Sequence, residues 1–210
     1  LSSAAGVPTP RICLIDHPTP NAFATGRNPA HAALAVTTGL LALLNREELA
    51  GVLGHELSHV LHRDTLISSV AATVAGAIGY LGFAARFGAL FGGYGGRGRR
   101  GGSALFILLM TTFASFAAML IQLAISRSRE FIADEGGARL TGNPMGLAHS
   151  LEKIARGAAR VPLDASPATA HLFIVSPLLR GGLSRLFSTH PPVEERVARL
   201  MEMAGASQAN

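Results

Sequence analysis

The residues HELSH at positions 55–59 have the types and the spacing of a catalytic metal site. Positions i and i+4 of a helix share one face, so His55 and His59 point the same way. Two neutral imidazoles at this spacing can bind one Zn²⁺ ion. Glu56 lies beside them as a general base for an attacking water, as in HExxH hydrolases. A surface helix with two unrelated histidines is the alternative, but this apolar run would leave their polar groups in need of a partner.

A third metal ligand has to come from another part of the chain, because a catalytic zinc ion takes three protein ligands and one water. Glu130 and Asp134 stand four positions apart in SREFIAD, so both carboxylates face one way. One can bind the metal while the other accepts a proton from a ligand histidine. His62 lies roughly 10 Å along the helix from His55, too far to share the ion. The alternative for the carboxylates is an ordinary solvated helix face.

Two long stretches without charge predict a membrane hairpin. They cover residues 65–85 and 103–126, and about 20 apolar residues suffice for a helix to cross a bilayer. A connector rich in glycine and arginine, residues 92–102, joins them. If the stretches run antiparallel, His59 and Glu130 emerge side by side from the same membrane face. A pair of buried helices in a soluble core is the alternative.

The composition agrees with a membrane protein. Of 210 residues, 49% are hydrophobic and only 15% are charged, against about 25% charged in soluble domains. The net charge of +5 suits anionic lipid headgroups, and no basic stripe interleaved with aromatic residues predicts nucleic-acid binding. A single cysteine, Cys13, excludes an internal disulfide framework. The first ten residues do not form a signal peptide, and they resemble the interior of a longer chain.

Turn and capping signals predict a mainly helical α+β chain with a small sheet. Asn45, with Glu48 three positions later, predicts a capped helix over about 46–63. Asn143 and Pro144 predict the start of another helix. Three strands are expected at 11–15, 21–26 and 32–37, a loop at 162–173, and a last helix from Pro191 or Pro192. The expected organisation is a strand region and HExxH helix over 1–64, the membrane hairpin over 65–126, and the second part of the catalytic domain over 127–210.

Four motifs, in this order around the apolar stretches, resemble the HtpX heat-shock membrane proteases, which are relatives of the CAAX prenyl proteases among the gluzincins. The motifs are PNAFATGRNPAHAALAVTTGLL, ELAGVLGHELSHVLHRDTLI, SRSREFIADEGGA and THPPVEERVARL. The resemblance implies a zincin-like metalloprotease domain. It also implies His55, His59 and Glu130 as ligands of one zinc ion, Glu56 as the catalytic base, and Asp134 as a support for a ligand histidine.

The resemblance gives a role to two further segments. It implies that an edge strand receives an extended substrate by strand addition; its residues are Asn21, Ala22, Phe23 and Ala24. It places His190 near the active site, to stabilise the oxyanion or to hold the substrate, with Arg196 supporting it through a carboxylate. The alternative for His190 is simply the start of a helix capped by proline.

The resemblance further implies a zinc-dependent endopeptidase of the bacterial inner membrane, multi-pass, with the catalytic domain facing the cytoplasm. Its expected partners are the lipid bilayer and polypeptide substrates, namely misfolded or damaged membrane proteins. Nucleic acid is not an expected partner, and the sequence specifies no oligomeric state. Members of this family begin with two further membrane helices, so we expect a fragment. The alternative function is a non-proteolytic metal-binding membrane scaffold, and the presence of Glu56 argues against it.

Overall fold

The computed structural model describes residues 1–91, 100–160, 174 and 190–208. The loop expected at 162–173 and most of the connector lie outside these residues. Contacts between Cα atoms divide the chain into two compact units. One unit contains residues 1–66 and 126–210, and the other contains residues 67–125. The first unit carries HELSH and SREFIAD, and the second carries the greater part of both apolar stretches.

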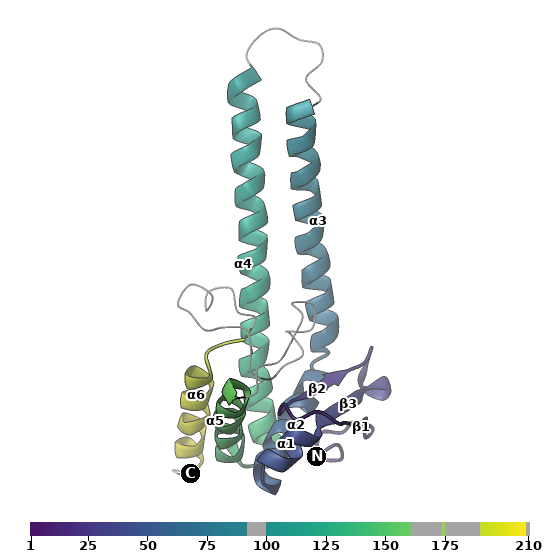
Figure 1. The fold of residues 1–210 in the computed structure, drawn as a ribbon, viewed down its shortest axis with the longest axis vertical. Coiled ribbons are helices and arrows are strands. Elements are labelled where there is room, and N and C mark those ends of the chain that lie inside the picture. The colour runs from purple at the N-terminus through teal and green to yellow at the C-terminus, as the bar shows by residue number, and fades with distance from the viewer. Residues whose placement is uncertain (92–99, 161–173, 175–189, 209–210) are drawn as a thin grey trace. The chain divides into compact units, whose positions relative to one another are not determined.

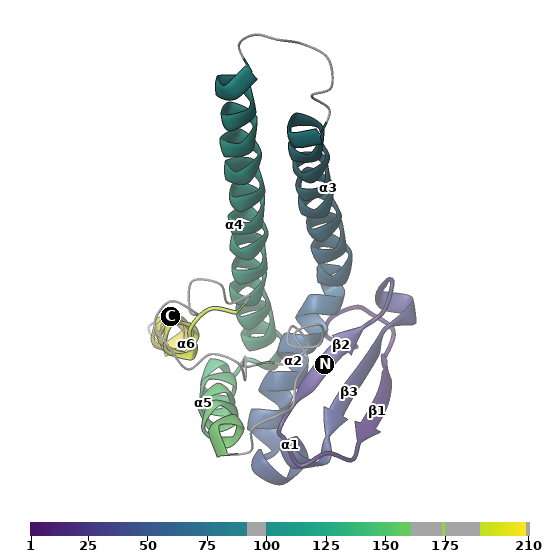
Figure 2. The same ribbon diagram turned by 45° about the horizontal axis from the view of Figure 1, so that its top comes forward.

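A three-stranded mixed sheet forms the N-terminal part of the first unit (Figure 2). Its strands are β1 (Arg11–Ile15), β2 (Ala22–Thr25) and β3 (Ala33–Thr37), in the order β1-β3-β2. β3 pairs in parallel with β1 and antiparallel with β2, so β2 stands at one edge. Figure 2 shows α2 (Arg46–Leu61) on the side of β2, and these two elements are in contact.

The helix that carries HELSH begins where the sequence predicts. The Glu48 N–H donates to the Asn45 side chain at 2.9 Å, and the Asn45 N–H donates to the Glu48 carboxylate at 3.0 Å, which completes a capping box. The helix ends at Leu61, two residues earlier than expected. The reason lies at Arg63, whose φ of 54° is left-handed and turns the chain away from the helix axis.

Helices complete the first unit (Figure 1). α1 (Thr38–Leu43) follows β3 directly and was not expected, whereas α5 (Pro144–Arg160) and α6 (Val193–Gln208) were. A short 3₁₀ turn, η1, spans Pro29–His31. α5 packs against both α2 and α6. These elements enclose a core of aliphatic side chains that includes Leu40, Val52, Leu147, Leu151, Ile154 and Leu200.

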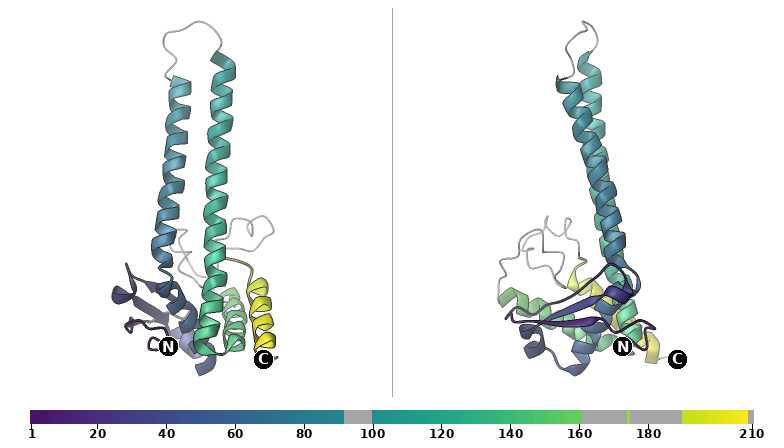
Figure 3. Two further views of the ribbon diagram at one scale, coloured as in Figure 1. Left: turned by 180° about the vertical axis from the view of Figure 1, so that it is seen from behind. Right: turned by 90° about the vertical axis from the view of Figure 1, so that its right-hand side faces the viewer.

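Two long helices carry the apolar stretches. α3 spans Asp64–Phe91 and α4 spans Arg100–Thr141. Both are long and apolar enough to cross a membrane, and only 6% of each apolar window is buried within the protein. In the second unit they run alongside each other (Figure 3), and Gly82 faces Thr111 and Ser115. The connector was expected to extend to Gly102, but α4 already begins at Arg100.

Candidate metal centre

Glycine residues allow α2 and α4 to meet almost backbone to backbone beside HELSH. A Cβ atom on Gly137 would lie 2.6 Å from the His55 backbone nitrogen, and one on Gly54 would lie 3.0 Å from the Gly137 carbonyl oxygen. The first distance is too short for a Cβ atom and the second is unusually tight, so larger residues would push the helices apart. The close approach brings the imidazoles of α2 within reach of the carboxylates of α4.

Three side chains converge at this crossing, and together they could hold a metal ion. Nε2 of His55 lies 3.1 Å from Nε2 of His59. The Glu130 carboxylate completes the group, with Oε1 3.6 Å from Nε2 of His59 and Oε2 3.8 Å from Nε2 of His55. One ligand atom from each residue lies within 4.8 Å of the others. These are the three ligands predicted from the sequence.

The donor set fits a zinc ion. A tetrahedral ion with bonds of about 2.0–2.1 Å separates neighbouring ligands by about 3.3 Å, close to the separations found here. Both histidines direct Nε2 into the group, because each Nδ1 is held by another carboxylate. Nδ1 of His55 lies 2.9 Å from Asp134, and Nδ1 of His59 lies 2.7 Å from Asp64. Such partners fix the tautomer that leaves Nε2 available to a metal.

Glu56 is buried beside this group, where a general base would be needed. Its carboxylate Oε2 accepts a hydrogen bond of 2.8 Å from the Ala24 N–H on β2. The base therefore touches the edge strand directly. Burial raises the pKa of the Glu56 carboxyl, and it outweighs the lowering by His55 and His59. A raised pKa suits a carboxylate that accepts a proton near neutral pH.

Arg196 neutralises the carboxylates on α4. It is almost completely buried, and it binds both oxygens of Asp134 at 2.6 and 2.7 Å. Its Nη1 also lies 3.2 Å from Oε2 of Glu130. Burial alone would lower the pKa of Arg196, but the charges of Asp134 and Glu130 raise it above its usual value. The cation therefore stays charged and holds both carboxylates in place.

His190 reaches the same carboxylate from the segment before α6. Its Nδ1 lies 3.1 Å from Oε2 of Glu130, and its side chain is only 10% exposed. Arg196 was expected to support His190 through a carboxylate, and Glu130 is the carboxylate that both contact. His62 lies outside the ligand group, and its Nδ1 contacts the Ser58 carbonyl oxygen at 2.8 Å.

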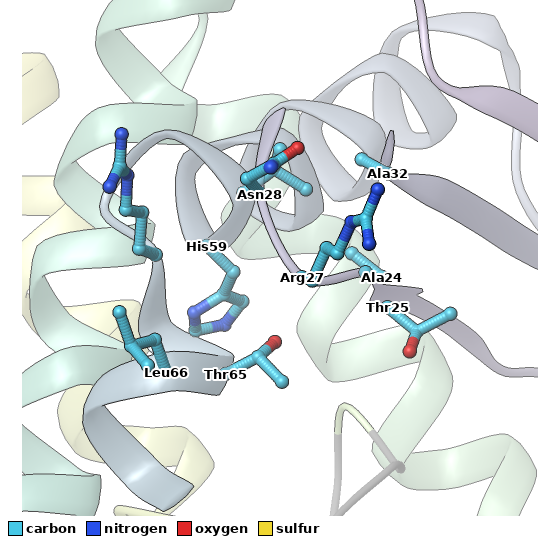
Figure 4. Close-up of a pocket in the computed structure, with 11 residues that line it drawn as sticks. Ala24, Thr25, Arg27, Asn28, Ala32, His59, Thr65 and Leu66 are labelled. Carbon is cyan, nitrogen blue, oxygen red and sulfur yellow. The ribbon is translucent and has the colours of Figure 1, made fainter. Parts of the chain in front are cut away.

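The segment Asn21–Ala24 is divided between a loop and a strand. Ala22, Phe23 and Ala24 belong to β2, whereas Asn21 precedes it and is buried. The Asn21 side chain accepts a hydrogen bond of 3.3 Å from the Ile174 N–H. A surface pocket opens at the end of this strand (Figure 4), lined by Ala24, Arg27, His59 and Leu66 among others. His59 and the edge strand thus line one pocket.

Asp64 is a site residue that was not predicted from the sequence. It lies five positions after His59, and five residues on one straight helix would turn it well away from the His59 face. The left-handed turn at Arg63 instead returns the chain, so that the Asp64 carboxylate meets His59. The only sequence signal was a carboxylate placed between HELSH and an apolar stretch. Arg129, which precedes Glu130, forms an ion pair with Asp64.

Comparison with known families agrees with this geometry. The model of peptidase family M48 matches residues 1–204. The chain belongs to peptidase family M48. It is therefore a metalloprotease, as predicted from HELSH and SREFIAD.

Relatives within the M48 family are highly similar to this chain. A protease HtpX homolog from Syntrophotalea carbinolica is 58% identical over 198 residues, covering 94% of this chain and 71% of that protein. Another, from Thermodesulfovibrio yellowstonii, is 54% identical over 204 residues, covering 97% and 72%. These matches confirm the predicted resemblance to HtpX proteases.

A solved structure has the same fold. Ste24p from S. mikatae superimposes with a TM-score of 0.60 at 19% identity, covering 95% of this chain and 48% of that one. The predicted fold class is thereby confirmed: mainly α, zincin-like, with a small sheet and two apolar helices long enough to span a membrane.

Proposed function

We propose that this protein is a zinc-dependent endopeptidase of the bacterial inner membrane that cuts misfolded or damaged membrane proteins. In this proposal the chain is multi-pass and its catalytic domain faces the cytoplasm. The observation that carries the proposal is the convergence of His55, His59 and Glu130 beside the buried carboxylate of Glu56. The family membership and the two apolar helices support it.

The three ligands would hold one zinc ion, which when bound polarises a peptide carbonyl and acidifies a water. Glu56 takes the proton of the attacking water. Its raised pKa makes the carboxylate a better proton acceptor, and the carboxyl then gives the proton to the leaving amine. Asp134 and Arg196 keep the His55 ring and Glu130 in position during these proton transfers.

The substrate would bind as an additional strand along β2. Edge strands offer unpaired N–H and C=O groups to an extended peptide, and β2 is paired to β3 on one side. Because the Ala24 N–H reaches Glu56 at 2.8 Å, a peptide on β2 would pass directly over the base. One of its side chains would enter the pocket beside His59. His190, held at Nδ1 by Glu130, would use Nε2 to donate to the carbonyl oxygen as charge develops on it.

The test is cleavage of casein, a disordered protein, by the zinc-loaded full chain in detergent. We expect the wild type to cut it and Glu56→Gln to lose about 10²–10⁴-fold in rate, the usual contribution of a general base. Zinc content measured by atomic absorption should be the same in both, because Glu56 is not a proposed ligand.

His62→Ala serves as the matched control, since His62 directly follows the helix that carries HELSH but lies outside the ligand group. It should cut casein at the wild-type rate. Equal cutting by the wild type and Glu56→Gln would overturn the assignment of the base. Zinc binding without cutting by the wild type would favour the non-proteolytic metal-binding scaffold.

A further inference from the structure

Each of the two histidines in the candidate metal group has a carboxylate of its own. Asp134 holds Nδ1 of His55 and Asp64 holds Nδ1 of His59, at 2.9 and 2.7 Å. The two carboxylates come from different helices, α4 and α3. Neither is exposed: Asp134 is 4% and Asp64 is 6% accessible. The second carboxylate has no role in the function proposed above.

Each carboxylate is also neutralised by an arginine. Arg196 binds Asp134, and Arg129 forms an ion pair with Asp64 while its own side chain is only 16% exposed. A buried carboxylate without a cation would be costly. The site therefore contains two similar series of contacts. In each series an imidazole contacts a carboxylate, and the carboxylate contacts a guanidinium group. Arg129 and Glu130 are adjacent in the sequence, so the arginine of one series directly precedes a proposed ligand.

His59 depends on its carboxylate more than His55 does. The His55 side chain is 2% exposed and is held by packing on all sides, whereas the His59 side chain is 19% exposed. Because packing encloses the His59 ring less, the hydrogen bond to Asp64 has a larger part in holding the ring in place. Without it the ring could rotate, or carry its proton on Nε2, and either change would remove the lone pair from the metal.

We propose that Asp64 is a positioning residue for His59, and that Arg129 holds Asp64 in place. Asp64 accepts the Nδ1 proton of His59, fixes the tautomer, and directs Nε2 at the metal. The inference rests on the proposed function in one respect, because it takes His59 to be a zinc ligand. Loss of such a partner lowers metal affinity about 10–100-fold.

The experiment measures zinc binding rather than cleavage. The full chain in detergent is titrated with Zn²⁺ against a chromophoric chelator, as wild type, Asp64→Ala and Asp64→Asn. We expect Asp64→Ala to bind zinc about 10–100-fold more weakly. Asp64→Asn should lose less, because its amide oxygen still accepts from Nδ1. The Co²⁺-loaded proteins supply a second readout, since a misoriented imidazole changes the visible spectrum of cobalt.

Glu152→Gln is the matched control. It also removes a carboxylate from an ion pair with an arginine, but on α5, where the Glu152 side chain is 40% exposed. Its zinc affinity and cobalt spectrum should equal those of the wild type. Circular dichroism checks folding, and if Asp64→Ala does not fold, Asp64→Leu decides, because leucine has nearly the same shape as aspartate and cannot accept from Nδ1. Wild-type zinc affinity and a wild-type cobalt spectrum in a folded Asp64 variant that lacks the acceptor would overturn the inference alone. Failure of the wild type to bind zinc would overturn the proposed function as well.

Discussion

At the scale of single residues, the site is a balance of buried charges. Glu130 is shared between His190 and Arg196, with contacts of 3.1 and 3.2 Å to the same oxygen. Arg196 also binds Asp134, so one cation holds two carboxylates of α4. Without the metal, the site is therefore rich in negative charge beside His59. The consequence is a measurable change in the proton affinity of that histidine.

Metal binding should release a proton from His59. Burial by itself would lower the pKa of His59, but the hydrogen bond to Asp64 and the charge of Glu130 raise it to about 9. The metal-free ring is thus protonated at pH 7, and a metal needs the neutral ring. Zinc affinity should therefore fall as the pH drops below 9. Calorimetric titrations with Zn²⁺ in buffers of different ionisation enthalpy should show about one proton released at pH 7, and less above pH 9.

His62→Ala should release the same number of protons, because His62 does not belong to the ligand group. A wild type that takes up zinc at pH 7 without releasing a proton would contradict the protonated state of His59.

The sequence predicted most of these residues because helix geometry makes local spacing reliable. His55, His59 and Glu56 follow from one helix, and Glu130 and Asp134 follow from another. Asp64 does not follow, because its contact with His59 depends on the left-handed φ of Arg63, and that residue carries no sequence signal for such a turn. Asn or Gly would have been the usual indication.

At the scale of elements, the crossing of α2 and α4 decides the geometry of the site. Gly54 and Gly137 face each other across it. The lack of side chains there lets the backbones approach, so that imidazole and carboxylate groups of ordinary length meet. The crossing could not be predicted from the sequence, because glycine in a helix has several uses and the partner helix is distant along the chain.

Gly137→Ala should destabilise the protein and weaken zinc binding together. The new methyl group would meet the His55 backbone at 2.6–2.8 Å, and overpacking of this kind costs about 1–3 kcal/mol. Chemical denaturation and a zinc titration measure the two effects.

Gly205→Ala on α6 is the control, because nothing lies within 4 Å of the position that a Cβ atom would take there. It should gain up to about 1 kcal/mol from helix propensity. Unchanged stability and zinc affinity in Gly137→Ala would show that the helices do not meet as closely as described.

Among the elements, the strands and the capped helices were predictable from local chemistry. Turn residues separate the strands, and a side-chain cap marks the start of α2. α1 was missed because it follows β3 without a turn residue. Its cap is Thr37, which is also the last residue of the strand. Because Thr37 both ends the strand and caps the helix, no turn residue in the sequence marks where the helix begins.

At the scale of the whole molecule, the two apolar helices determine where the protease works. α3 and α4 expose large apolar side chains along their length, including Leu81, Phe83, Phe106, Leu109 and Phe113. Exposing so much apolar surface to water would cost free energy. A bilayer would remove this cost, which agrees with a membrane metalloprotease.

The protein should therefore stay with the membrane pellet during alkaline carbonate extraction. Phe113→Arg should reduce the pelleted fraction, because Phe113 lies near the middle of the apolar stretch 103–126 and an arginine at the centre of a membrane helix costs about 2.5–3.5 kcal/mol on insertion. Leu41→Arg is the control, since Leu41 is exposed on α1, outside the apolar stretches. Release of the wild type into the supernatant would contradict a membrane-spanning hairpin.

The order of the proposed ligands along the chain has a further consequence. About seventy residues separate His59 from Glu130, and an ion bound to both closes this long loop as a reversible crosslink. Because unfolding separates the two residues and releases the ion, an ion that binds only the folded chain stabilises it by mass action. Zinc would then determine the lifetime of the protein in addition to its chemistry. A cell short of zinc would hold an enzyme that is inactive and also easier to unfold and degrade.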